Sequence, residues 1–442
     1  MWITIAQLLL SLSILVILHE CGHFFPAKWF KTRVEKFYLF FNPYFSLFKK
    51  QIGETEYGIG WLPLGGYVKI AGMVDESFDT AQLQNEPQPW EFRSKPAWQR
   101  LIIMIGGVTI NFILGFFIFA MLLWSKGIDY IKTEDLKYGI TTDSVSRTMG
   151  FQDGDLIVGV QGEKLDRFDR RSVIRKLVFE DKHIVNLLRD GQPLDLALTD
   201  EQIAFFTKYD SKDYLLWGPR TIARIKEVTD DSPAKKSGVM AGDRIIGINQ
   251  SEVIYVSDVK NYLSKSEEQN FNLSLLRGSD TINLALSTQD KKMGVYFETP
   301  ADQLIISKES FTFLESLPKG VTKGIDLLSD QLKAFGHMFA GKIKAKDSLG
   351  GFASIAGMFD KTWDWPSFWH TTAIISIILG FMNLLPIPAL DGGYVLFLLI
   401  EVVTGRKVSD KFIEKATMIG FILLLGLLLY ANGLDVLRHF GK

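Results

Sequence analysis

Four long stretches without charged residues constrain this 442-residue chain more than any other feature. A helix needs about 20 apolar residues to cross a hydrocarbon core of about 30 Å, and each stretch has roughly that length. They cover residues 2–18, 101–124, 366–390 and 416–434, and His370 is the one side chain among them that could gain a charge. A buried core helix is usually shorter and amphipathic, so the pattern predicts a polytopic α-helical membrane protein with four transmembrane helices.

The first stretch has an alternative interpretation as a cleaved secretory signal. A signal needs basic residues before its apolar run and a small-residue cleavage site after it. No Lys or Arg precedes Lys28, and no such cleavage site follows the stretch. We therefore expect this stretch to be retained as a membrane span.

Basic residues flank the four stretches unevenly. They follow the first stretch, precede the second and separate the third from the fourth: Lys28, Lys31, Arg33, Lys36, Lys95, Arg100, Arg406, Lys407, Lys411 and Lys415. Cytoplasmic flanks are rich in Lys and Arg, so both termini and residues 127–365 are expected to be extracytoplasmic. Arg438 and Lys442 at the C-terminus argue mildly for the opposite orientation.

Charge and cysteine content exclude two classes of function. The chain has 49 Lys+Arg and 50 Asp+Glu, so it lacks the net basic charge typical of a nucleic-acid-binding protein. Its single cysteine, Cys21, excludes an intramolecular disulfide and a Cys-rich zinc module. We expect no nucleic-acid partner.

A repeat lies in the extracytoplasmic segment. Residues 150–160 (GFQDGDLIVGV) recur as residues 238–248 (GVMAGDRIIGI), and both glycines and the aspartate are displaced by 88 residues. Each copy is typical of a Gly-Asp turn before an apolar strand, and the spacing suits two tandem small domains. The pattern resembles the PDZ domain, which binds extended peptides along a sheet edge. The alternative is two generic β-rich domains without a ligand.

A further helix is predicted before the third stretch. Apolar residues step by three or four from Val321 to Phe339, which places them on one helical face, and lysines lie among them. The helix could lie on the membrane surface or pack on the second PDZ-like domain. We favour the membrane surface.

The sequence His19-Glu20-Cys21-Gly22-His23 ends the first stretch. At about 100° per residue the two histidines project only about 40° apart, so both imidazoles can reach one metal ion. Glu20 lies beside them, where it can take a proton from a water, whereas Cys21 lies on the opposite face. Ionisable residues joined to a membrane span indicate a functional site. The alternative is a flanking cluster at the membrane interface.

A catalytic zinc site needs a third protein ligand. Asp391 is the only acid at the inner end of the third stretch, on the same expected side as the two histidines. Pro386 and Pro388 precede it and interrupt the helix, which is tolerated at that depth where the backbone lines a protein cavity. Alternatively, Asp391 caps a following helix, and Glu401 is then the fallback ligand.

A β-hairpin is predicted between the first two stretches. Tyr57, Ile59 and Trp61 alternate as in a strand, residues 63–66 supply a turn, and residues 67–70 return. A strand edge there could pair with an unwound substrate and satisfy its backbone groups in lipid. The alternative is a purely structural cytoplasmic hairpin.

Together these motifs resemble the site-2 protease family of intramembrane zinc metalloproteases, over essentially the whole chain. The resemblance implies Zn²⁺ held by His19, His23 and Asp391, with Glu20 as the general base. It also implies substrate-contacting or ligand-supporting roles for Asn383, Pro388, Gly65, Gly66, Tyr67 and Asn111.

The match to that family is not complete. Residues 62–69 match its membrane-associated β-hairpin. Its Gly-Pro-x-x-Asn motif, however, is Gly107-Val108-x-x-Asn111 here, and a second Gly-Pro is replaced by Gly351-Phe352. These departures concern local helix geometry rather than the metal ligands.

The expected organisation has five parts. They are the first two transmembrane helices with the HExxH site and the hairpin (1–126), two extracytoplasmic PDZ-like α+β domains (127–215 and 216–303), an amphipathic membrane-surface segment (304–365) and the last two transmembrane helices with the third ligand (366–442).

The resemblance implies an intramembrane zinc endopeptidase in the bacterial inner membrane. Its substrates would be single-pass transmembrane proteins of the anti-sigma factor type, cut after a first cleavage has trimmed their outer domain, and remnant signal peptides. The PDZ-like domains would act as a size filter, and we expect a monomer in contact with the lipid bilayer. One alternative is a catalytically idle membrane scaffold whose PDZ-like domains bind peptides, and another is an anchored protease for soluble targets.

Overall fold

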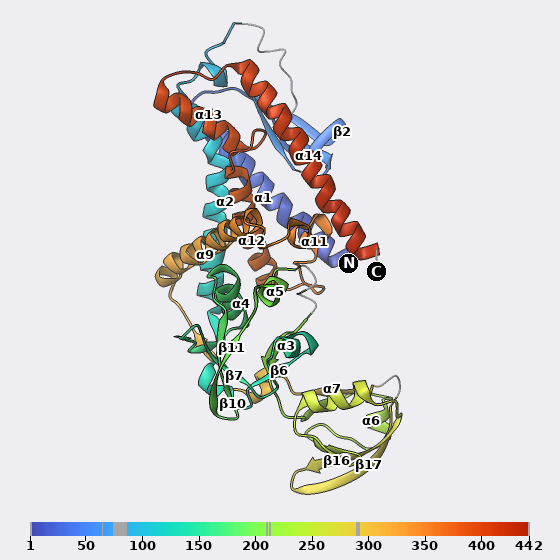
Figure 1. The fold of residues 1–442 in the computed structure, drawn as a ribbon. Coiled ribbons are helices and arrows are strands. Elements are labelled where there is room, and N and C mark those ends of the chain that lie inside the picture. The colour runs from blue at the N-terminus through green and yellow to red at the C-terminus, as the bar shows by residue number, and fades with distance from the viewer. Residues whose placement is uncertain are drawn as a thin grey trace. The chain divides into compact units, whose positions relative to one another are not determined.

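A computed structural model describes residues 2–63, 65–73, 86–208, 211, 214–288 and 292–440. The chain forms two compact units (Figure 1). The first, the helical unit, contains Met1–Gly127 and Ser310–Lys442. The second, the β unit, contains Ile128–Glu309.

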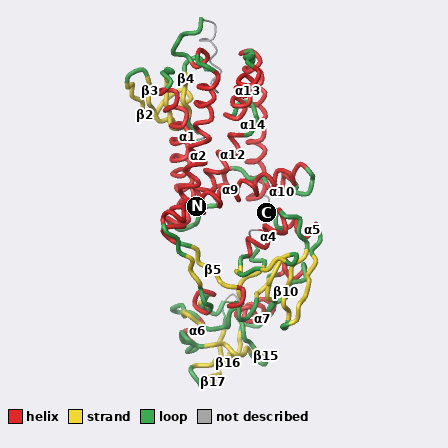
Figure 2. The backbone as a smooth tube through the Cα atoms, turned by 90° about the vertical axis from the view of Figure 1, so that its left-hand side faces the viewer, coloured by secondary structure: helices red, strands yellow, loops and turns green. Residues whose placement is uncertain are grey.

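Long apolar helices dominate the helical unit. Its helices are α1 (Trp2–Trp29), η2 (Phe92–Ser94), α2 (Ala97–Lys126), α9 (Phe313–Phe339), α10 (Ala345–Ser348), α11 (Phe352–Ala356), α12 (Trp365–Leu384), α13 (Asp391–Thr404) and α14 (Asp410–Phe440). Among the described residues, α1, α2, α12 and α14 are long and apolar enough to cross a membrane, which confirms the four expected spans. Both chain termini lie at the same end of this unit (Figures 1 and 2).

The third apolar stretch is not a single helix. Helix α12 ends at Leu384, and α13 begins at Asp391 after a turn that holds Pro386 and Pro388. Proline cannot donate the backbone hydrogen bond that would continue the helix. The span is therefore shorter than residues 366–390, and the break falls where the prolines predicted it.

Helix α9 has two apolar faces. Gly320 and Gly324 lie against α2, because a Cβ at either would meet atoms of Ala120 or Phe116. The face predicted from the apolar spacing is exposed at Val321, Ile325, Leu332 and Phe339, whereas its Leu328 and Phe335 pack inside the helical unit, Phe335 against Phe381 of α12. An exposed apolar face is what a helix in contact with lipid would have, so the membrane-surface position remains a prediction.

A four-stranded sheet follows α1, and it corrects the expected hairpin. Its strands are β1 (Val34–Leu39), β2 (Phe41–Ile52), β3 (Thr55–Leu62) and β4 (Tyr67–Ile70), in the order β2-β3-β1-β4. The hairpin of residues 57–70 is wrong, because β1 lies between β3 and β4. The hairpin instead joins β2 to β3 through Gly53, where φ is +60°. Leu64, in the expected turn, lies outside the described residues.

The position of β1 has a physical cause in Tyr38. This side chain is fully buried and stacks on Tyr67, with ring centroids 5.3 Å apart. It also lies over Gly58 of β3, where a Cβ would collide with the ring. Burying this aromatic side chain is worth roughly 2 kcal/mol or more, which favours β1 at the centre of the sheet.

The β unit contains two lobes whose elements follow the same order, except that helix α5 has no counterpart in the second lobe. The first lobe has β6 (Ile140–Thr142), α3 (Ser144–Thr148), β7 (Leu156–Val160), β8 (Glu163–Lys164), α4 (Arg170–Phe179), β10 (Ile184–Arg189), β11 (Gln192–Ala197), α5 (Asp200–Phe205) and β12 (Trp217–Pro219). The second has β13 (Ile225–Val228), α6 (Pro233–Lys236), β14 (Arg244–Ile248), β15 (Ser251–Glu252), α7 (Val256–Lys265), β16 (Asn270–Arg277), β17 (Asp280–Ser287) and β18 (Val295–Phe297). Their main sheets have equivalent orders, β11-β10-β7-β8 and β17-β16-β14-β15.

Further short elements begin and end this unit or connect its parts. They are β5 (Ile128–Lys132), η3 (Thr133–Asp135), β9 (Arg167–Phe168), α8 (Pro300–Gln303) and β19 (Ser307–Glu309). Strands β19, β5 and β9 form one small sheet. Strand β12 pairs with β6, so the first lobe extends beyond residue 215, where its domain was expected to end.

The 88-residue repeat includes an ion pair that the sequence analysis did not identify. Arg189 Nε lies 2.8 Å from Asp155 Oδ1, and Arg277 Nε lies 2.7 Å from Asp243 Oδ1. In both pairs a second hydrogen bond of 2.8 Å joins Nη2 to Oδ2. Each lobe thus has a buried carboxylate held by a two-pronged arginine, the strongest common geometry for such a pair.

Candidate metal centre

Helix α1 brings the two histidines of the HExxH motif together. They lie one turn apart and are almost fully buried, with ring centroids 4.9 Å apart in an edge-to-face arrangement. Their Nε2 atoms are separated by 3.2 Å. The two nitrogen atoms therefore point at a common position, as the spacing predicted.

Asp391 reaches the same position from α13. It is the first residue of that helix, and Leu390 is the N-cap, so Asp391 does not cap the helix with its side chain. Its Oδ2 atom lies 3.2 Å from Nε2 of His19 and 3.3 Å from Nε2 of His23. Gly393 allows the preceding turn to pack closely, because a Cβ there would lie 2.6 Å from the Ile387 carbonyl oxygen.

These three ligand atoms fit a tetrahedral metal ion. Ligand atoms about 2.0 Å from a tetrahedral zinc lie about 3.3 Å from one another, close to the three separations observed. Asp391 Oδ2 is buried and accepts no hydrogen bond from the described residues. Within the described part of the chain, this is the one group of three His, Cys, Asp or Glu side chains whose ligand atoms all lie within 4.8 Å.

Helix α2 supports the two imidazoles from the opposite side. His23 Nδ1 donates a hydrogen bond of 2.9 Å to the Ile103 carbonyl oxygen. One turn later, Gly107 faces both rings, and a Cβ there would lie 2.7 Å from His19 Cε1. Another turn later, the Asn111 amide lies 3.1 Å from His19 Nδ1. Sequence reasoning missed Ile103 and Gly107 as parts of the site.

The glycine of the HExxH motif lets α1 and α2 approach each other. A Cβ at Gly22 would collide with the Gly106 carbonyl, and one at Gly106 with the Gly22 carbonyl. Two backbones in contact leave no room for a side chain. The glycine at position 22 therefore sets the distance from the histidines to α2.

Glu20 lies beside the ligand group without belonging to it. It is 9% exposed, and its carboxylate is not among the three convergent ligands. A Cβ at Gly66 would lie 3.5 Å from Glu20 Cγ and 2.6 Å from Val16 Cγ1. The glycine-containing segment before β4 therefore lies directly against α1 at Glu20.

Of the other expected site residues, Asn383 lies close to a histidine of the site, whereas Tyr67, Gly65 and Pro388 have other contacts. The Asn383 amide Nδ2 is 3.5 Å from His19 Nε2, at the limit of a hydrogen bond. Tyr67 instead contacts other residues of the sheet: it stacks on Tyr38 and donates a hydrogen bond of 2.9 Å to Asn42 Oδ1. Gly65 lies next to the Phe41 ring, and the Pro388 backbone contacts Gly420 of α14.

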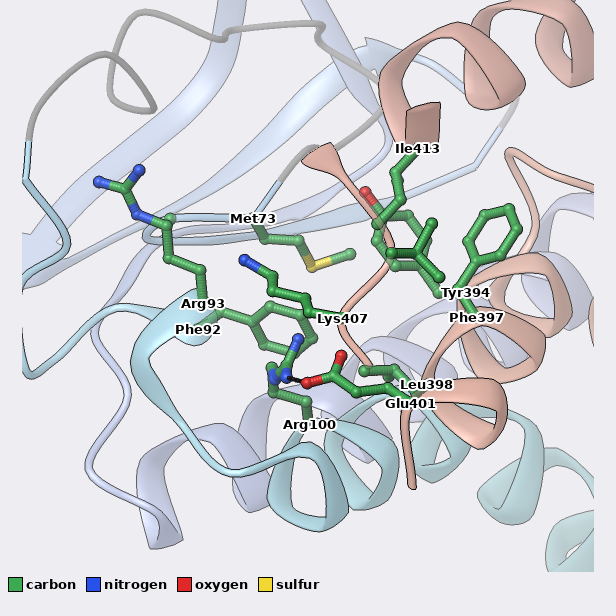
Figure 3. Close-up of a pocket in the computed structure, with 12 residues that line it drawn as sticks. Met73, Phe92, Arg93, Arg100, Tyr394, Phe397, Leu398, Glu401, Lys407 and Ile413 are labelled. Carbon is green, nitrogen blue, oxygen red and sulfur yellow. Dashed lines mark hydrogen bonds and ion pairs between the residues drawn. The ribbon is translucent and has the colours of Figure 1, made fainter. Parts of the chain in front are cut away.

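Glu401, the fallback ligand, has a different partner. Its Oε1 lies 2.5 Å from Arg100 Nη2. Figure 3 shows this ion pair in a pocket that α13 lines together with Phe92 and Met73. An arginine satisfies this carboxylate, so Glu401 is not part of the ligand group.

Comparisons with known proteins agree with a metal centre of this kind. The model of peptidase family M50 matches residues 7–427. The chain is 25% identical over 455 residues to the Regulator of sigma E protease of Haemophilus influenzae, covering 98% of this chain and 99% of that protein. It is 27% identical over 433 residues to a protein of Borreliella burgdorferi named as a zinc metalloprotease, covering 96% of each chain.

A third relative also matches over nearly the full length of both chains. It is a protein of Pasteurella multocida, also named as a zinc metalloprotease, and it is 28% identical over 457 residues, covering 98% of each chain. The match to the family covers nearly the whole chain, including both helices that carry His19, His23 and Asp391. The chain therefore belongs to peptidase family M50, the site-2 protease family of zinc metalloendopeptidases.

Proposed function

We propose that this protein cleaves single-pass transmembrane proteins within the membrane, at a zinc ion held by His19, His23 and Asp391. The observation that carries the proposal is the ligand triangle, with edges of 3.2, 3.2 and 3.3 Å. Two of the three atoms that form this triangle belong to residues of α1, a helix apolar enough to cross a membrane. A peptide bond cleaved there belongs to a substrate that lies in the membrane itself.

The chain's own residues divide the chemistry among them. Zinc held by His19, His23 and Asp391 would supply a Lewis acid that could polarise a carbonyl and lower the pKa of a water. Glu20, next to His19 and almost fully buried, accepts the proton of the attacking water and donates it to the leaving amine. Asn383, whose amide nitrogen is close to His19, is placed to donate a hydrogen bond to the scissile carbonyl.

Strand β4 and the glycines before it offer a way to hold the substrate. A substrate helix hides its carbonyls in internal hydrogen bonds, so it must unwind before cleavage. Strand β4 is an edge strand of its sheet, and Gly66 before it lies against Glu20. An unwound substrate paired with this edge would have its backbone satisfied beside the general base. The alternative is a sheet that only supports α1.

The proposed location is the bacterial inner membrane, with both termini and the β unit extracytoplasmic. The common end of the two termini and the basic residues at the opposite ends of the spans support this orientation (Figure 2). We propose that the protein acts as a monomer.

We further propose that the two lobes are PDZ-like domains and act as a size filter. Their shared strand order and their matching buried Asp–Arg pairs support a tandem duplication. The chain enters the β unit directly from α2 and leaves it before α9. A substrate with a large outer domain would collide with two folded domains that are joined in sequence to two of the spans, whereas a trimmed stub would pass.

The Haemophilus influenzae relative suggests the class of substrate. That protein is named Regulator of sigma E protease. We propose that the substrates of the present chain include membrane-anchored anti-sigma factors that a first protease has trimmed, and remnant signal peptides.

Reconstitution in lipid vesicles with a trimmed single-pass substrate tests the proposed reaction. Wild-type protein should cut within the substrate's membrane segment, and product mass gives the position. Glu20→Gln keeps the shape of the side chain but cannot accept the proton, so cleavage should fall at least about a hundredfold with zinc retained. Full turnover by the zinc-loaded Glu20→Gln variant would contradict the assigned base. Zinc binding without cleavage of any membrane or soluble substrate would favour a scaffold.

Deletion of residues 138–299 with a flexible linker in their place tests the size filter. The folded, zinc-loaded deletion should cut untrimmed substrates and still cut trimmed ones, because the three proposed ligands lie outside the deleted segment. A deletion protein that cuts trimmed substrates but rejects untrimmed ones would overturn the filter. The lobes would then have a recruiting or activating role.

A further inference from the structure

One stripe of α2 supports both histidines. Ile103, Gly107 and Asn111 follow one another at intervals of four residues, so they lie on one face of the helix. The first accepts a hydrogen bond from His23 through its backbone carbonyl, the second gives both rings space, and the third contacts His19. Two ligands on α1 are thus oriented by three residues of a different span.

The Nδ1 atoms of the two histidines face different kinds of hydrogen-bonding group. His23 Nδ1 faces the Ile103 carbonyl oxygen at 2.9 Å, an acceptor. His19 Nδ1 faces the Asn111 amide nitrogen at 3.1 Å, a donor, and Asn111 Oδ1 is buried without a hydrogen-bond partner among the described residues. A neutral imidazole that binds a metal through Nε2 carries its proton on Nδ1 and must therefore donate it.

Rotation of the Asn111 side-chain amide by a half-circle resolves this mismatch. It exchanges the positions of Oδ1 and Nδ2, so the orphaned oxygen becomes the acceptor for His19 Nδ1–H. We propose that Asn111 is a positioning residue of the metal centre: its Oδ1 accepts the His19 Nδ1 proton and so holds the Nε2 lone pair toward the metal. This inference rests on the proposed function, because it assumes that His19 is a ligand.

The surroundings of Asn111 favour this role over direct contact with substrate. The residue is completely buried in the middle of α2. Its backbone carbonyl accepts a hydrogen bond of 2.7 Å from Ser376 Oγ on α12. Gly380 of α12 is also close, since a Cβ there would lie 3.4 Å from Asn111 Cβ. Contacts with α12 therefore hold this turn of α2 in place, and the amide of Asn111 lies 3.1 Å from His19 Nδ1.

Three variants of the full chain separate the acceptor from the other properties of the side chain. Asn111→Leu keeps the approximate volume and removes the acceptor, whereas Asn111→Asp keeps acceptor oxygens and removes the donor. Thr109→Val is the matched control, because Thr109 lies on the same helix, is exposed, and donates its hydroxyl hydrogen bond to the Ile105 carbonyl. Zinc affinity in detergent, measured by competition with a chromophoric chelator, is a readout independent of catalysis.

Asn111→Leu should bind zinc about 10- to 100-fold more weakly than wild type, as expected for loss of a partner that orients a ligand. Asn111→Asp and Thr109→Val should each stay within about threefold of wild type, a small change on that scale. Wild-type affinity in Asn111→Leu, or an equal loss in a folded Asn111→Asp, would overturn the inference. If Asn111→Leu does not fold, Asn111→Ala takes its place with the same expectation.

Asp391→Ala separates failure of this inference from failure of the proposed function. If Asp391→Ala loses zinc and Asn111→Leu does not, the three-ligand site stands and the role of Asn111 is wrong. If Asp391→Ala keeps zinc with wild-type affinity, the proposed ligand set itself is wrong.

Discussion

Asp391 in the helical unit and Asp243 in the β unit are both largely shielded from solvent, yet they have opposite partners. Asp243 receives two hydrogen bonds from Arg277 and a third from the Met240 backbone N–H. Asp391 Oδ2 faces two imidazole nitrogens and accepts no hydrogen bond from the described residues. A buried carboxylate that serves folding needs its donors within the protein. A buried carboxylate that faces two histidine nitrogens and accepts no hydrogen bond is suited to bind a cation.

Glu401, in the helical unit itself, is a second buried carboxylate that an arginine binds. Arg100 binds it at 2.5 Å, and cation and carboxylate are both largely buried. Burial of a carboxylate at one end of the spans therefore does not identify a metal ligand. The more specific observation is that Asp391 has no arginine partner among the described residues.

The largest expected effect concerns Asp391. Loss of one of three protein ligands in Asp391→Ala should weaken zinc binding by more than about a hundredfold and abolish cleavage. Glu401→Gln, which alters a carboxylate held by an arginine, should keep wild-type zinc affinity. Metal analysis after dialysis against a weak chelator measures both. Retained zinc in Asp391→Ala, or lost zinc in a folded Glu401→Gln, would reverse the assignment of the two carboxylates.

A smaller effect is expected in the β unit. Asp243→Ala leaves Arg277 without its partner, and we expect the free energy of unfolding of the β unit to fall by about 2 kcal/mol. Zinc affinity should not change. Chemical denaturation followed by near-ultraviolet circular dichroism measures the loss, with the exposed Asp230→Ala as the matched control. Equal stability of the two variants would show that the buried pair does not support the lobe.

The smallest effect is the dependence of β-unit stability on acid. Burial raises the pKa of Asp243, but hydrogen bonds from Arg277 and the Met240 N–H outweigh it and hold the pKa below its usual range. Because the folded pKa lies below the unfolded one, this stabilisation is complete above about pH 4 and is lost as pH falls through the lowered pKa. Asp243→Asn should therefore unfold with less dependence on pH between about 4 and 2. An unchanged pH profile in Asp243→Asn would contradict this account.

The parts of the fold and site that sequence could predict depend on local patterns. Apolar runs predicted the spans, because crossing lipid fixes their length and composition. The spacing of His19 and His23 predicted their convergence, because one turn of helix separates them. Pro386 and Pro388 predicted the break before Asp391 for an equally local reason.

The parts that sequence could not predict depend on contacts between distant segments. The order β2-β3-β1-β4 places the buried Tyr38 of β1 over Gly58 of β3, a contact that neither strand alone indicates. The hydrogen bond from His23 to Ile103 uses a backbone carbonyl, which has no sequence signature. Arg189 and Arg277 could have been found, because they share the 88-residue offset of the aspartates that they bind.

X-ray absorption at the zinc edge of the purified wild-type protein tests the central claim most directly. The triangle of His19, His23 and Asp391 predicts one zinc per chain with two imidazole ligands and no sulfur in a four-coordinate shell. Zinc bound with sulfur scattering, or without the multiple scattering of two imidazoles, would contradict it.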